Sequence, residues 1–135
     1  MSRKATIFLA VMLVGFLSMF IVGKALASGT WYYYDITVNP FGGAGSTNNE
    51  TKQYNGQCTV DCDWVGGDYD LWAYLQLVDN TTVSDKQLIN DGTFIRFNNT
   101  ATAGQTVHMT FQSGKTDRVH IETVGHWSPD THNLI

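Results

Sequence analysis

Hydrophobic and polar residues alternate with a period of two along most of the chain, and this pattern predicts β-strands rather than helices. The clearest stretch is 53–64, where every second residue from Tyr54 to Trp64 falls on one side and Gln, Asn, Thr and Asp fall on the other. Because successive strand side chains point to opposite faces, one face of this segment is expected to lie in the core. Similar but less regular patterns occur in six further segments: 31–38, 70–78, 83–89, 93–98, 105–112 and 117–124.

Gly, Asn, Asp and Pro residues separate these segments, as turns between short strands require. Residues 41–46 are interpreted as a flexible loop, and charged residues that interrupt 83–89 indicate an edge strand. Ser113-Gly114-Lys115-Thr116 is interpreted as a hairpin that connects 105–112 to 117–124. Six or seven antiparallel strands of this length predict an all-β, jelly-roll-like sandwich of two sheets, since a single flat sheet would leave an apolar face in water.

The first 27 residues differ from the rest. A basic start is followed by 19 mostly apolar residues, and Ala25-Leu26-Ala27 supplies the small residues that a signal peptidase recognises. The pattern predicts a signal peptide over residues 1–27, helical before cleavage, and one secreted β-sandwich domain over residues 28–135. The alternative is an uncleaved anchor that holds the domain outside the membrane, because 19 residues at about 1.5 Å each just span a hydrocarbon core. Only in that case is the membrane a partner.

Removal of the leader changes the charge of the chain. The remaining 108 residues carry twelve acidic and five basic side chains, which gives a net charge of −7. This charge argues against nucleic acid or an anionic membrane surface as partner, because both require a basic surface. No serine lies in a nucleophile-elbow pattern, and a domain of this size offers little room for a substrate cleft, so we expect no enzyme activity.

Cys58 and Cys62 lie four residues apart on one face of the most regular predicted strand. In an extended strand their Cα atoms would be about 13 Å apart, twice the distance that a disulfide spans. The pattern therefore favours two buried free thiols that act as small hydrophobic side chains. A bulge or turn at 59–61 that permits a small-ring disulfide is the alternative.

Two groups of residues suggest a metal ion. Four aspartates surround Gly66-Gly67, namely Asp61, Asp63, Asp68 and Asp70. Carboxylates on a turn suit calcium, but the order of an EF-hand is missing, and the alternative is a solvated acidic loop. His108 and His120 would be diagonal neighbours about 7 Å apart across the predicted hairpin, although a zinc site needs a third ligand. We therefore expect no resident cofactor, with calcium at the aspartates as the alternative.

Two aromatic pairs are expected on outward faces of their strands. Trp31 and Tyr33 face away from the inner set of the first strand, and Trp72 and Tyr74 face away from the inner set of 70–78. Exposed planar rings beside Asn, Asp and Gln are what stacking on sugar rings requires, so these four residues are the candidate binding site. The alternative is that the rings pack in the core or in an interface.

Three short segments carry a resemblance to known proteins. They are Thr37-Val38-Asn39-Pro40-Phe41, residues 97–104, and Gly125-His126-Trp127-Ser128-Pro129-Asp130. Together they resemble an uncharacterised family of small secreted proteins of Gram-positive bacteria that end in Gly-aromatic-Trp-Ser-Pro-Asp. The resemblance implies export from a Gram-positive cell and an all-β fold, and it implies no activity and no site residues.

These features predict a secreted, non-enzymatic recognition domain that acts at or beyond the cell envelope. The expected partner is a glycan, a cell-wall polymer or a protein. One alternative is an antagonistic, bacteriocin-like factor that acts on competitor cells. Another is an exported domain that binds calcium or hydrolyses a substrate.

Overall fold

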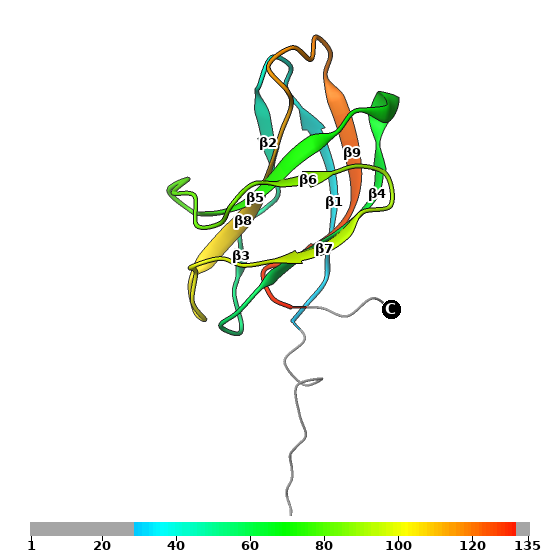
Figure 1. Ribbon diagram of the computed structural model, residues 1–135. Coiled ribbons are helices and arrows are strands. Elements are labelled where there is room, and N and C mark those ends of the chain that lie inside the picture. The colour runs from blue at the N-terminus through cyan, green and yellow to red at the C-terminus, as the bar shows by residue number, and fades with distance from the viewer. Residues whose placement is uncertain (1–28, 132–135) are drawn as a thin grey trace, which may run out of the picture.

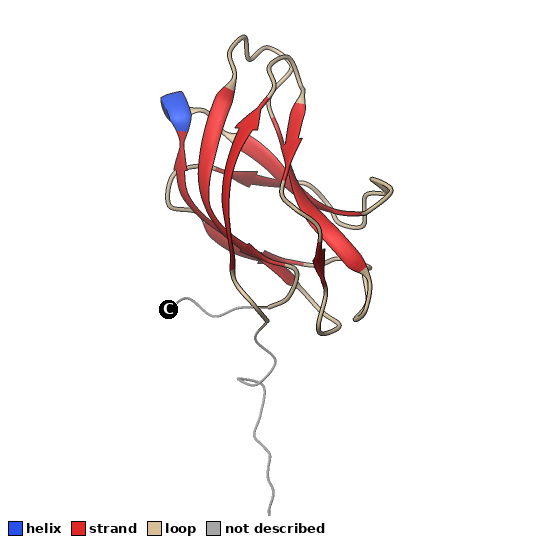
Figure 2. Ribbon diagram, turned by 180° about the vertical axis from the view of Figure 1, so that it is seen from behind, coloured by secondary structure: helices blue, strands red, loops and turns tan. Residues whose placement is uncertain are grey.

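The computed structural model describes residues 29–131 and shows an all-β sandwich of two antiparallel sheets (Figure 1). The first sheet has the order β1 (Tyr32–Val38), β9 (Ile121–Ser128), β4 (Cys58–Val65) and β7 (Phe94–Phe97). The second has the order β2 (Ala44–Ser46), β8 (Thr106–Gln112), β5 (Leu71–Leu77) and β6 (Gln87–Ile89), and β3 (Glu50–Thr51) also pairs with β8. The predicted fold class is confirmed, and Figure 2 shows the two layers from behind.

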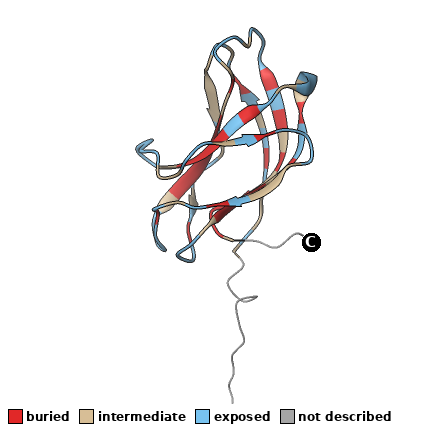
Figure 3. Cartoon of the chain, in the orientation of Figure 1, coloured by how far each residue is buried: buried red, intermediate tan, exposed pale blue. Residues whose placement is uncertain are grey.

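The core lies between the two sheets, and most of it consists of inward residues of the predicted alternations. These residues include Tyr34 and Val38 in β1, Cys58, Val60 and Cys62 in β4, Leu71, Ala73 and Leu75 in β5, and Val107, Met109 and Phe111 in β8. Figure 3 shows that buried residues concentrate on the central strands, whereas the edge strands carry mostly intermediate and exposed residues. Both cysteines are buried and free, so the expectation of two unbridged thiols is confirmed.

Strand β4 departs from the predicted alternation at its end. A bulge at Asp63 shifts the register against β9, so that Cys62 lies opposite Gly125 but Trp64 lies opposite Val124. Because one extra residue moves every later side chain to the other face, the indole of Trp64 is 44 % exposed and Val65 is buried instead. The strand also begins at Cys58, five residues later than expected.

The predicted hairpin between 105–112 and 117–124 is wrong. β8 pairs with β2, β3 and β5 in the second sheet, whereas β9 pairs with β1 and β4 in the first. Residues 113–120 therefore connect the two sheets. This link is held by side chains: Asp117 Oδ2 accepts the backbone N–H of Gly114 (2.7 Å), and Ser113 Oγ donates to the carbonyl of Asn39 (2.7 Å).

The two histidines of the predicted hairpin are consequently not neighbours. His108 lies opposite Gln76 of β5 and is buried, whereas His120 is exposed in the link before β9. The diagonal arrangement considered for a zinc ion is absent from the structure.

The nine strands of residues 29–131 exceed the six or seven expected. The two additional strands, β2 and β3, are too short to produce a period-two pattern, and β2 lies in the segment predicted to be a flexible loop. β6 lies at the edge of its sheet as expected. The predicted signal peptide lies outside the described residues, and within residues 29–131 no helix is long and apolar enough to cross a membrane.

Candidate functional site

The four aromatic residues predicted to bind a ligand lie on two different surfaces. Trp31 and Tyr33 belong to the outer face of the first sheet, because they alternate with the inward Tyr34. Trp72 and Tyr74 belong to the outer face of the second sheet. These two faces point in opposite directions, so the two pairs do not form one binding surface.

In the second pair, the ring of Trp72 is exposed and the ring of Tyr74 is buried. The side chain of Trp72 is 41 % exposed, and it borders a shallow pocket of about 380 Å³ beside Gln112 and Lys115. Tyr74 is only 7 % exposed, and the Lys86 ammonium lies 5.0 Å from its ring centroid. Because Tyr74 is covered, this surface offers a single indole to a ligand.

The first pair is part of an aromatic cluster on the outer face. The imidazole of His126 lies 5.6 Å from the ring of Tyr33 and 6.2 Å from that of Trp31, edge-on to both. Trp31 also contacts Phe94 edge-on, at 6.3 Å between ring centroids. The rings therefore stabilise one another, and Tyr33 at 63 % exposure is the one most available to a ligand.

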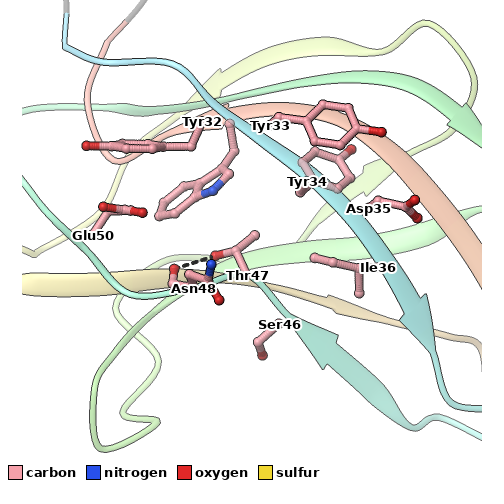
Figure 4. Close-up of a pocket in the computed structure, with 10 residues that line it drawn as sticks. Tyr32, Tyr33, Tyr34, Asp35, Ile36, Ser46, Thr47, Asn48 and Glu50 are labelled. Atoms are coloured by element: carbon pink, nitrogen blue, oxygen red, sulfur yellow. Dashed lines mark hydrogen bonds between the residues drawn. The ribbon is translucent and has the colours of Figure 1, made fainter.

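Next to Tyr33 the open edge of the sandwich forms a groove of about 330 Å³ between β1 and the segment from β2 to β3 (Figure 4). We call it the β1 groove. Its lining residues are Tyr32, Tyr33, Tyr34, Asp35, Ile36, Ser46, Thr47, Asn48, Glu50 and Trp127.

The aromatic wall of the β1 groove follows from the position of β1 at a sheet edge. Tyr32 lies opposite Trp127 in the β1–β9 register, with ring centroids 5.9 Å apart and planes inclined by 40°. No strand pairs with the other side of β1 in the described sheet, so the half-buried Tyr32 ring stays accessible at the edge. Trp127 is buried beneath it and fixes its position.

The polar wall of the β1 groove is fixed to β8. Met109 and Thr47 exchange two hydrogen bonds: the Thr47 N–H donates to the Met109 carbonyl, and the Met109 N–H donates to Thr47 Oγ1, each at 2.9 Å. Thr47 Oγ1 also donates to the carbonyl of Asn48 at 3.0 Å, as the dashed line in Figure 4 marks. Asn48 and Glu50 are thereby held on the side of the groove that faces Tyr32.

One end of the β1 groove is acidic. Asp35 and Glu122 lie on neighbouring strands, and a hydrogen bond from one carboxyl to the other raises the pKa of Glu122, with further help from the charge of Asp35. The groove therefore combines aromatic ring faces, amide and hydroxyl groups, and carboxylates. Such a set suits a polar ligand with apolar faces that is neutral or positively charged.

The four candidate calcium ligands are dispersed. Asp61 is on the outer face of β4 opposite His126, and burial followed by the charge of Asp63 raises the pKa of Asp61. Asp68 lies in the 3-10 turn η3 (Gly66–Asp68), and Asp70 accepts a hydrogen bond from Asn90. Within residues 29–131 there is no group of three or more His, Cys, Asp or Glu side chains that could hold a metal ion.

Sequence reasoning missed most of the β1 groove. Tyr32 and Trp127 have the pattern of core residues, and only the position of β1 at the sheet edge opens the ring of Tyr32 to solvent. Glu50 and Asn48 belong to segments without a strand pattern. Comparison with models of protein families, with curated proteins and with solved structures gave no match.

Proposed function

We propose that this protein is a secreted, non-enzymatic recognition domain that binds the sugar units of a glycan or cell-wall polymer in the β1 groove, at or beyond the cell envelope. The observation that carries this proposal is the juxtaposition of the Tyr32 ring, supported by Trp127, with the polar side chains of Asn48 and Glu50 across the groove. A sugar ring has an apolar face that packs on an aromatic ring and hydroxyl groups that pair with carboxylate and amide groups. The groove volume is near the lower end of ordinary ligand sites, which suits one or two sugar units.

The negative charge of the β1 groove limits which polymers can bind there. Asp35 and Glu50 contribute carboxylates to the groove, and the domain as a whole is acidic. A polymer rich in phosphate or carboxylate would be repelled by this surface. We therefore propose a neutral or amine-bearing glycan as the partner rather than an anionic one.

The test is retention of the secreted protein on insoluble polysaccharides and on isolated bacterial walls, with tryptophan fluorescence to measure affinity. Tyr32→Ala and Glu50→Gln should each weaken binding about tenfold, which corresponds to about 1.4 kcal/mol of binding free energy. Trp72→Ala is the matched control, because it removes an exposed aromatic ring from the opposite face. Equal weakening by the control, or retention on no wall or neutral glycan, would refute the proposal.

The same protein distinguishes the alternative functions. Inhibition of neighbouring strains that survives Tyr32→Ala would favour an antagonistic factor that acts through another surface. A rise of the melting temperature with added calcium would favour a cation-binding domain, because a ligand that binds only the folded state stabilises it. Retention on protein rather than glycan would identify a protein partner.

A further inference from the structure

Lys52 and Asp130 form an ion pair that is completely enclosed. Lys52 Nζ lies 3.7 Å from Asp130 Oδ1, and both side chains have no exposed surface. Lys52 follows β3, and Asp130 follows β9, so the pair joins segments that are far apart in the sequence. Removing two charges from water is costly, so the complete burial of this ion pair requires an explanation.

Both ends of the described chain seal this pair from solvent. Gly29 lies so close to Asp130 that a β-carbon added to Gly29 would stand 2.6 Å from the Asp130 β-carbon. The N–H of Gly29 donates to the carbonyl of Thr131 at 3.3 Å, and Figure 1 shows the two ends side by side. Water is therefore excluded from the side of the pair on which the chain ends meet.

The carboxyl group of Asp130 is held by backbone donors. Asp130 Oδ1 accepts the N–H groups of Gln53 (3.1 Å) and Tyr54 (2.9 Å), and Oδ2 also accepts from Gln53 at 3.0 Å. Two consecutive N–H groups directed at one carboxyl oxygen stabilise the negative charge that develops there when a nucleophile attacks the carbon.

The amine of Lys52 is held beside this carboxyl group. Its Nζ donates to the carbonyl of Pro129, the residue before Asp130, at 2.5 Å. Burial lowers the pKa of Lys52, although the charge of Asp130 opposes that shift, and a lower pKa increases the share of the neutral, nucleophilic amine. Because the fold already holds the two groups side by side, their reaction avoids the loss of entropy that accompanies a reaction between separate molecules.

We propose that Lys52 and Asp130 condense to an intramolecular isopeptide bond. A proton first passes from the ammonium to the carboxylate, which leaves a neutral amine and a carboxylic acid. Nζ then attacks Cγ of Asp130, the new C–N bond forms, and the C–O bond to the hydroxyl group breaks. Of the three ammonium protons, one remains on the amide and two leave in a molecule of water. The step changes no oxidation state and needs no co-reactant.

The bond would attach the end of β9 to the β3–β4 loop by a covalent link. Such a link reduces the freedom of the unfolded chain and therefore stabilises the folded domain, as a disulfide does. It would do so without the two cysteines, which are buried and free. Such added stability would be useful to a domain that acts outside the cell.

The test is the intact mass of the secreted full-length domain, measured after denaturation. The measured mass of the wild-type chain should be lower by one water than the mass calculated from its sequence. The Lys52→Arg variant should have the full calculated mass. Lys86→Arg is the matched control: Lys86 is exposed and donates to Gln112, and its replacement should leave the loss of water unchanged. A wild-type chain at full sequence mass overturns the proposal, whether or not the Lys52 variant folds.

A tryptic map locates the loss. Trypsin should fail to cut after Lys52, and the peptide that ends at Lys86 should be joined to residues 119–135. A succinimide at Asp91-Gly92 would also lose water, but it would leave Lys52 cleavable and place the loss in residues 87–96. That result would likewise overturn the proposal.

Discussion

The hydroxyl oxygen of Tyr34 lies 2.9 Å from the point at which a β-carbon on Gly125 would stand. The two residues are opposite each other in the β1–β9 register, and Gly125 is opposite Cys62 of β4 on its other side. The Tyr34 ring thus crosses a central strand at a residue without a side chain, and the carbonyl oxygen of Asp61 lies even closer to the same point.

Gly125→Ala should therefore destabilise the domain by about 2 to 3 kcal/mol, because the added methyl group meets backbone as well as the Tyr34 hydroxyl. Urea denaturation followed by tryptophan fluorescence measures the change. Gly66→Ala is the control, since its methyl group would mainly contact the exposed ring of Trp64, and it should cost clearly less. Similar losses for both variants would show that crowding at Gly125 is not the cause.

Tyr34→Phe should leave stability unchanged or raise it by up to about 1 kcal/mol. The Tyr34 hydroxyl is buried near the Cys62 thiol and the Thr123 hydroxyl, yet it makes no hydrogen bond of ordinary geometry within residues 29–131. Burial raises the pKa of this phenol, because the phenolate would lose its hydration. Removing an unpaired buried hydroxyl removes its desolvation cost while the ring contact with Phe111 remains. A loss above about 1 kcal/mol would reveal a hydrogen bond to this oxygen.

The two cysteines should resist alkylation in the folded protein. Burial raises the pKa of Cys58 to about 12 and also raises the pKa of Cys62, so neither forms the reactive thiolate at neutral pH. Iodoacetamide at pH 7.5 should label neither residue in native protein and both in denaturant without reductant. Mass spectrometry counts the labels. Denatured protein that accepts no label without reductant would show that the two are bridged instead.

The period of two predicted the strands that have a clear inner face, because burial of alternate side chains leaves a direct trace in the sequence. Cys58, Val60 and Cys62 are examples. The same pattern could not indicate which sheet a strand joins, and β8 and β9 were therefore predicted to pair although they belong to different sheets. The bulge at Asp63 likewise depends on how β4 fits against β9, not on residue type.

The candidate site was less predictable than the fold for a related reason. Tyr33 was selected correctly as an exposed ring because it alternates with buried residues. Tyr32 becomes accessible only because β1 is an edge strand, and strand order is a tertiary property. In the sequence, Lys52 and Asp130 cannot be distinguished from charged residues on the surface. Only the folded chain brings them together in the interior.

The free energy of unfolding of the domain should decrease as the pH falls below neutral, and His108 should be one cause of this decrease. Its imidazole is buried on the outer face of the second sheet, with Nε2 3.1 Å from Gln76 Oε1 and Nδ1 3.0 Å from Asn49 Oδ1. Burial lowers the pKa of His108 below its ordinary value of 6.5, because the charged imidazolium would lose hydration. A histidine with a lowered pKa in the folded state binds fewer protons there than in the unfolded chain. Its contribution to stability is therefore complete above pH 6.5 and is lost as the pH falls below that value.

His108→Gln cannot titrate, so its melting temperature should fall less than that of the wild type between pH 7.5 and pH 5.5. The side-chain amide of glutamine has two N–H donors for the oxygens of Gln76 and Asn49, so the variant should remain folded at pH 7.5. The matched control is His120→Gln, which removes an exposed histidine from the link before β9 and should follow the wild-type curve. Parallel curves for wild type and His108→Gln would contradict the assignment, because a buried neutral imidazole must take up a proton or unfold as the pH falls through its range.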